Sequence, residues 1–232
     1  MTSDVVTGLH NPGELAFDPV RDGFGFRNPV GEVAIGNGRG PLLRRLGAIL
    51  YGKGLCFGMV TMALRRFAEQ PADASERPLA GLPPTPELLG EIRRYHVRQY
   101  MPRAVLAAVK DWLRSRGGKP DSVLRRLRLA GTDSHLICFG PAVNRRFLWC
   151  LMRAHAVAPY RVETENREAR VYVYDPNYPG DRGRYVNFRR DGSGRAREFE
   201  YEGFGTRWGW GISLFPHSAI GDTARHGLRA IP

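Results

Sequence analysis

The sequence has few cysteines, no long hydrophobic run and no recognisable leader. Three cysteines, Cys56, Cys138 and Cys150, are too few and odd in number for a disulfide framework, so at least one thiol is free. The longest apolar runs, such as residues 147–152, are far shorter than the ~20 residues that a membrane span needs. The first residues lack the basic and apolar regions of a secretory signal, which predicts a cytoplasmic protein.

Lysine is also scarce. Lys53, Lys110 and Lys119 are the only lysines among 35 basic residues, and the 23 acidic residues leave a net charge of +12, nearly all of it from arginine. Such a charge permits nucleic acid or acidic membrane surfaces as partners. However, the sequence contains no ribonucleoprotein motif and no zinc knuckle, so a nucleic-acid-binding protein is the most distant of the functional alternatives.

The pattern of the chain changes along its length and predicts an α+β fold within a single domain, residues 1–232. Residues 1–50 are rich in glycine and proline, which is typical of loops. Residues 51–130 have a mostly helical period, and residues 131–232 have the shorter period of an antiparallel sheet. We therefore expect a helical lobe packed against a β lobe.

Several elements have clear local signals. Residues 55–67 form an apolar stripe at helical spacing, and Thr85 followed by Pro86 is a helix start. Residues 135–139 read as a short strand, and residues 185–189 and 199–201 as a hairpin. Residues 208–214 alternate large and small side chains, as in a strand that closes a curved sheet.

Cys56 lies where a glycine-rich turn enters an apolar helix, in the segment Gly54-Leu55-Cys56-Phe57-Gly58-Met59. A thiol at this place faces unpaired N–H groups and the positive end of the helix dipole, which favours the nucleophilic thiolate. The alternative for this segment alone is a buried helix cysteine that packs like alanine. Cys138 and Cys150 lie in apolar strand-like segments, and we interpret both as core thiols.

His155 opens an apolar strand, and a hairpin turn centred near Glu165 would place Asp175 directly opposite it. Opposed residues of two strands have Cβ atoms ~4.5–5.5 Å apart, so this carboxylate could hold an imidazole N–H and fix its tautomer. Without Cys56, the same pair would more often be a structural hydrogen bond.

Taken together, these segments resemble the papain-like cysteine peptidase superfamily, in particular its bacterial members. The resemblance rests on residues 54–59 at a helix start, on His155-Ala156-Val157, and on the segment 173–180, Val-Tyr-Asp-Pro-Asn-Tyr-Pro-Gly. The chain order of Cys, His and Asp matches, and so does the division into a helical and a β lobe. Residues 22–28, Asp-Gly-Phe-Gly-Phe-Arg-Asn, also resemble the N-terminal segment of such proteins.

The resemblance implies that Cys56 is the nucleophile, His155 the general base and acid, and Asp175 the orienting carboxylate. Asn177 is the alternative orienting residue, because many papain-like enzymes use an asparagine. These enzymes usually carry a glutamine a few residues before the cysteine, and this chain has none there. The N–H of Cys56 could stabilise an oxyanion, with Tyr51, Lys53 or Asn37 as a second donor. Loss of one donor costs ~10²- to 10³-fold in rate, so weak activity is compatible with this sequence.

The function expected from the sequence is therefore a cysteine hydrolase that acts on a peptide or amide through a thioester. A transglutaminase-like acyltransferase shares the order Cys, His, Asp, and a non-catalytic binding protein of the same fold is a further alternative. We expect no cofactor, and no metal because His135 and Cys138 lack a second ligand pair. The sequence leaves the oligomeric state open.

Overall fold

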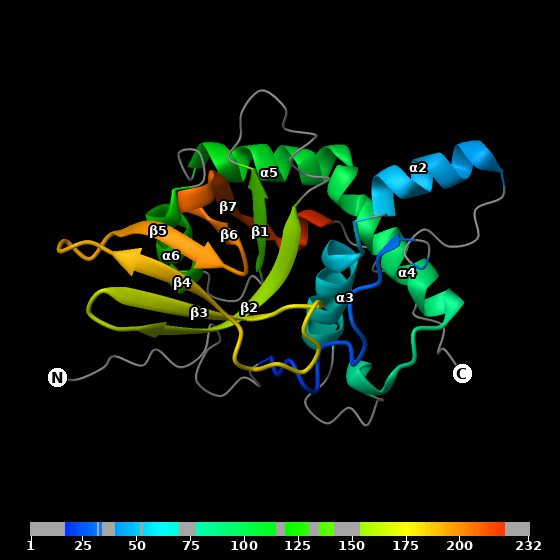
Figure 1. Ribbon diagram of the computed structural model, residues 1–232, viewed down its shortest axis with the longest axis horizontal. Coiled ribbons are helices and arrows are strands. Elements are labelled where there is room, and N and C mark those ends of the chain that lie inside the picture. Colours follow the sequence, from blue (N-terminus) through cyan, green and yellow to red (C-terminus); the bar gives the residue numbers. More distant parts are fainter. Residues whose placement is uncertain are drawn as a thin grey trace.

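The computed structural model describes residues 17–31, 33, 40–51, 53–69, 78–114, 119–129, 135–141 and 154–220 (Figure 1). Its helices are α2 (Pro41–Tyr51), α3 (Cys56–Glu69), α4 (Pro86–Val97), α5 (Pro102–Arg114) and α6 (Pro120–Leu129), with short 3-10 turns η1 (Leu79–Gly81), η2 (Arg98–Tyr100), η3 (Thr206–Trp208) and η4 (His217–Ile220). Its strands are β1 (His135–Pro141), β2 (His155–Thr164), β3 (Glu168–Tyr174), β4 (Tyr185–Arg190), β5 (Ala196–Tyr201), β6 (Phe204–Gly205) and β7 (Trp210–Pro216).

The seven strands form one antiparallel sheet in the order β6-β5-β4-β3-β2-β1-β7. The last strand, β7, returns to pair with β1 along its whole length. The two edge strands also approach each other, because the rings of Phe204 and Trp210 are 4.8 Å apart. The sheet is therefore strongly curved and nearly closed, and the expected α+β class is confirmed.

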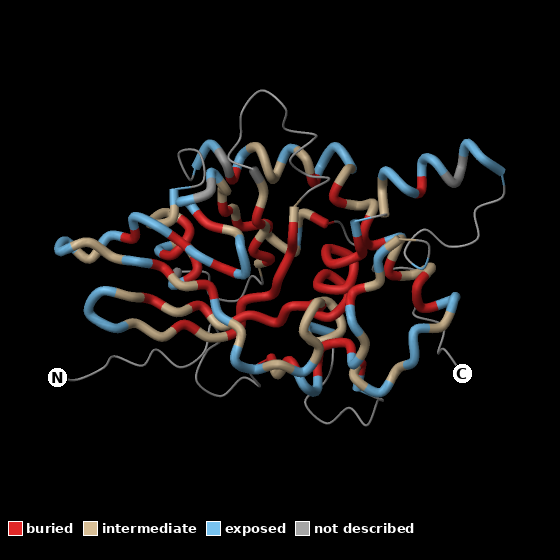
Figure 2. The backbone as a smooth tube through the Cα atoms, viewed as in Figure 1, coloured by how far each residue is buried: buried red, intermediate tan, exposed pale blue. Residues whose placement is uncertain are grey.

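The two faces of the sheet have separate hydrophobic clusters (Figure 2). Because successive side chains of a strand point to opposite faces, β2 places Ala156 in one cluster and Val157 in the other. The first cluster contains α3, α4 and the outer side of β2. The second lies on the concave side, where strand residues such as Phe139 pack against one face of α6.

Helix α3 is buried over nine consecutive residues from its first residue, Cys56, because it lies between α4 and β2 (Figure 1). Gly58 allows this close packing: a Cβ atom at this position would be 2.2 Å from the carbonyl oxygen of Ile92 in α4. The first turn of α3 is thus fixed against both the helices and the sheet. This position brings Cys56 to the start of β2.

Two boundaries differ from the expectation. Residues 41–50 form most of helix α2 rather than loops, because Pro41 suits a first helical position and apolar residues follow at helical spacing. The side chains of Leu42, Leu46 and Ile49 in this helix are exposed. In addition, α6 packs with β5 and β7, so the helical segment 51–130 contributes to both clusters.

Candidate active site

Cys56 is held at the first position of α3 by the loop that precedes it. Gly54 has a φ of +115°, a conformation that favours glycine, and its amide donates a hydrogen bond of 2.8 Å to the Tyr51 carbonyl. The next amide, that of Leu55, donates to Asn28 Oδ1 at 2.7 Å. Cys56 itself is only 6% exposed, and its Sγ lies 4.0 Å from the carbonyl oxygen of Ala154.

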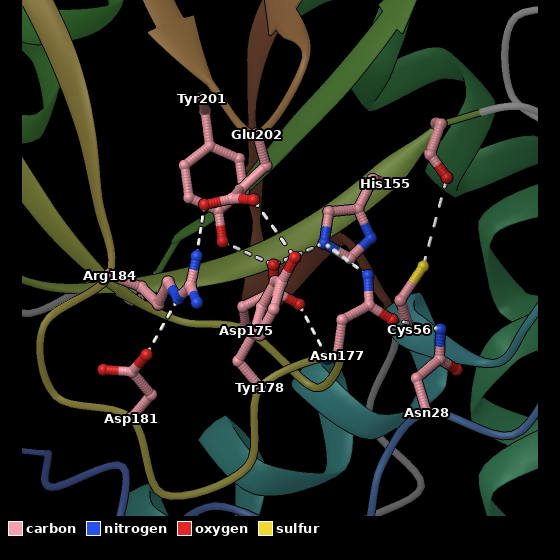
Figure 3. A network of polar contacts seen from close by, with 11 residues as sticks. Asn28, Cys56, His155, Asp175, Asn177, Tyr178, Asp181, Arg184, Tyr201 and Glu202 are labelled. Atoms are coloured by element: carbon pink, nitrogen blue, oxygen red, sulfur yellow. Dashed lines mark hydrogen bonds and ion pairs between the residues drawn. The ribbon is translucent and has the colours of Figure 1, made fainter.

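His155 and Asp175 meet beside this thiol (Figure 3). His155 is the first residue of β2, and Asp175 follows the last residue of β3. His155 Nε2 is 2.9 Å from Asp175 Oδ2. Asp175 is 1% exposed and also accepts hydrogen bonds from the Tyr201 hydroxyl and, at 2.8 Å, from the Asn177 backbone N–H. Three distant segments of the chain therefore converge on one buried network.

The network favours an ion pair between the ring and the carboxylate. Burial lowers the pKa of His155, but the interactions with Asp175 and Cys56 raise it by more than burial lowers it. The resulting pKa is about 10. Burial likewise opposes ionisation of Asp175, yet the hydrogen bonds from His155 and Tyr201 hold its pKa below the usual value. Both shifts therefore favour the imidazolium and the ionised carboxylate.

The orientation of the His155 ring leaves one nitrogen for Cys56. Nε2 contacts Asp175, so Nδ1, the ring nitrogen on the thiol side in Figure 3, is the one that faces Cys56. The ring lies nearly parallel to Phe139 and Phe204, with centroid distances of 6.5 and 5.9 Å. These two aromatic rings limit the rotation of the imidazole, so Nε2 stays on the side of Asp175 and Nδ1 on the side of Cys56.

The strand register differs from the one expected. Glu165 and Glu168 exchange backbone hydrogen bonds, so the turn is centred between residues 166 and 167. An irregularity between Pro159 and Arg161 then shifts the pairing by one residue, and the last pair is Ala158 with Tyr174. Asp175 is thus not directly opposite His155. It reaches the ring because the chain leaves the strand at this point and turns, with the Tyr178 N–H donating to the Asp175 carbonyl.

Asn177 touches the same ring, but with the wrong group for an orienting residue. Its Nδ2 lies 3.4 Å from His155 Nε2, while its Oδ1 accepts a hydrogen bond of 3.0 Å from Asn28 Nδ2. Because Asn28 Oδ1 accepts from the Leu55 amide, both amide orientations are fixed. The Nε2–H of His155 therefore finds its acceptor in Asp175, not in Asn177.

Asn28 is a residue that the sequence analysis did not select. It is 8% exposed, and its backbone N–H donates a hydrogen bond of 2.8 Å to the Pro176 carbonyl. It thus connects the loop before Cys56 with the loop after Asp175. It ends the segment 22–28, but the sequence gives it no role there, because its partners are 27 and 149 positions away.

The residues considered as the second oxyanion donor lie in different parts of the chain. Asn37 lies outside them, and Lys53 is exposed on the loop before α3. Tyr51 ends α2, with its ring 6.0 Å from that of His96. Tyr100 is another residue that the sequence did not indicate. The centroid of its ring lies 6.3 Å from that of His96. Burial, then the charge of Cys56, raises the pKa of Tyr100 to about 12, so its hydroxyl keeps its proton.

The remaining candidates carry less chemistry. Cys138 is a free, partly buried thiol, and Cys150 lies outside the described residues. Within the described ranges there is no group of three or more His, Cys, Asp or Glu that could hold a metal ion. No single helix in these ranges is long and apolar enough to cross a membrane, although Arg45–Tyr51 and Cys56–Glu69, bent by 59°, pass that test as a pair.

Comparison with protein-family models, curated proteins and solved structures finds no match for this chain. The functional argument therefore rests on the geometry of Cys56, His155 and Asp175.

Proposed function

We propose that this protein is a cysteine hydrolase of papain-like type, which cleaves a peptide or amide bond through a thioester on Cys56. The observation that carries the proposal is the convergence of a cysteine at a helix start with a histidine whose Nε2 is hydrogen-bonded to a buried carboxylate and whose other ring nitrogen faces the thiol. The buried pair of His155 and Asp175 suits catalysis better than packing, because burial of a charged pair costs free energy unless its hydrogen bonds are complete.

The reaction begins from a thiolate on Cys56 and an imidazolium on His155. The thiolate attacks the acyl carbon, and the carbonyl π electrons move to the oxygen. His155 then gives its Nδ1 proton to the leaving amine as the C–N bond breaks and a thioester forms. Water attacks the thioester while His155 accepts its proton, and the acid leaves as the C–S bond breaks. Asp175 keeps Nε2–H fixed throughout.

Two donors suit the oxyanion. The Cys56 N–H is at the first position of α3, where backbone amides have no acceptor within the helix. The Tyr100 hydroxyl is protonated and close enough to be influenced by the Cys56 charge. A phenol would thus replace the side-chain amide that papain-like enzymes usually provide before the cysteine.

The test is the rate of alkylation at Cys56 by iodoacetamide, a reagent small enough for a thiol that is 6% exposed. The rate is followed by mass spectrometry from about pH 4 to about pH 10. At about pH 6 an ordinary thiol is under ~1% thiolate. We expect Cys56 to react at least about tenfold faster at this pH in the wild type than in His155→Ala.

Two controls keep the result specific. Cys138 in the same sample reports general changes in reagent or unfolding, and His217→Ala removes a histidine outside the network. An unchanged alkylation rate at Cys56 in His155→Ala would show that Cys56 and His155 form no ion pair. This result would favour a binding protein of the same fold. If the ion pair is present, p-nitrophenyl acetate then tests acyl transfer to Cys56.

Acyl transfer to an amine is a second candidate, favoured by one observation. His155 opens β2 and Asp175 directly follows β3, the other strand of the same hairpin, an arrangement that transglutaminase-like enzymes share. In that reaction an amine replaces water as the attacking group, and the product is an amide. Partition of the acyl-enzyme between water and an added primary alkylamine distinguishes the two, because an acyltransferase would form the amide in preference to the free acid.

A further inference from the structure

A pocket of about 370 Å³ lies against the side of α3 that faces away from Cys56. Thr61 and Arg65 of α3 line one wall, and residues of α4, η2, α5 and η4 complete it. Thr61 is five residues after Cys56, which places it about 7.5 Å further along the helix and about 140° around it. The pocket is thus separate from the network of His155 and Asp175.

The described lining of this pocket is strongly basic. Arg65, Arg98 and Arg103 contribute three guanidinium groups, against one carboxylate, that of Glu69. Glu69 is bound to Arg65 with an N–O distance of 2.7 Å. Among the described lining residues the guanidinium groups thus outnumber the carboxylates, which suits an anion.

Two of the arginines are held in place by an aromatic ring. Arg98 and Arg65 lie 4.8 and 5.9 Å from the centroid of Tyr95, which also lines the pocket. Such stacking orients the planar guanidinium groups, so less side-chain entropy is lost when they bind a carboxylate or phosphate.

We propose that this pocket binds a small anionic molecule through its carboxylate or phosphate oxygens. Arg98 and Arg103, which both line the pocket, donate hydrogen bonds to the oxyanion. The volume lies within the ~300–1,000 Å³ of small-molecule sites. This proposal does not depend on the reaction proposed for Cys56, because the two sites share no side chain.

The test is isothermal titration of the full chain with inorganic phosphate and, separately, with malonate, at an ionic strength held constant with KCl. We expect saturable binding of one equivalent of at least one of these probes, and the two arms show whether phosphate or carboxylate fits better. Arg98→Gln and Arg103→Gln should each weaken this binding by about tenfold or more.

The matched control is Arg125→Gln, which removes an arginine on α6 whose side chain is 69% exposed. It should leave the affinity unchanged, with all variants first checked for native circular dichroism. Equal weakening by Arg125→Gln would show non-specific attraction to a basic protein, and absence of saturable binding by the wild type to either probe would overturn the proposal. Loss of alkylation at Cys56 with anion binding intact would count against the proposed hydrolase alone.

Discussion

The Asp175→Asn variant probes the network at its least exposed member. The substitution keeps the shape of the side chain but removes the charge that faces His155 Nε2 at 2.9 Å. Hydrogen bonds to charged groups contribute about 1.5–3 kcal/mol, and about 1.4 kcal/mol corresponds to one pH unit of pKa. Since the pKa of His155 is raised to about 10, we expect it to fall in the variant by about one to two pH units.

The assay is an NMR titration of the His155 ring, followed through its carbon-bound protons, in the wild type and in Asp175→Asn. A Cys56→Ala variant should also lower the pKa of His155, because Cys56 is its other hydrogen-bond partner. The stabilisation from a raised histidine pKa is complete below about pH 6.5 and is lost as the pH rises toward 10. The cost of Asp175→Asn to folding should therefore be smaller at alkaline pH. An unchanged His155 titration in both variants would refute the coupling.

Three further predictions concern residues around the helix start. Tyr100→Phe should slow acylation of Cys56 by p-nitrophenyl acetate by about 10²-fold while leaving its alkylation by iodoacetamide unchanged, and equal acylation rates would exclude the hydroxyl as an oxyanion donor. Burial lowers the pKa of His96 to about 4, so stability should fall by about 2 kcal/mol between about pH 6.5 and 5, as the unfolded chain takes up the proton. Urea unfolding of His96→Gln should lack this slope, and the same slope in both proteins contradicts the assignment. Gly54→Ala would bring a Cβ atom within 2.6 Å of Asn28 Nδ2 at a φ of +115°, and it should cost about 1–3 kcal/mol in thermal unfolding, whereas an unchanged midpoint would mean that the loop adapts.

Elements with strong local signals were predictable from the sequence. Thr85 caps α4 by accepting a hydrogen bond from the Leu88 amide at 3.3 Å, with Pro86 as the first helical residue. The hairpin of β4 and β5 and the strand β1 also lie where the pattern places them. These features depend on side chains that interact within a few positions of each other, so the sequence shows them directly.

The surroundings of the candidate site were not predictable in the same way. Asn28 and Tyr201 act on the network through contacts that only the folded chain makes, and Tyr100 is related to Cys56 only through its raised pKa. Tyr201, for example, donates to a carboxylate 26 positions earlier in the chain. Helix α2 was missed for a different reason: the glycines and prolines before it dominate the composition of residues 1–50.

The pairing of His155 with Asp175 shows how a correct partner can follow from an incorrect register. Extension of the Ala158–Tyr174 pair by three residues would place Asn177 opposite His155, so the sheet alone would bring an amide to the ring. Asp175 takes this place because the strand ends at Tyr174 and Asn28 holds residues 176 and 177 away from the ladder. The position of the carboxylate is therefore a property of the loop and of Asn28. Asn28→Ala should then weaken the His155–Asp175 contact without touching either residue, lowering the pKa of His155 in the same NMR titration, and an unchanged titration would mean that the strands suffice.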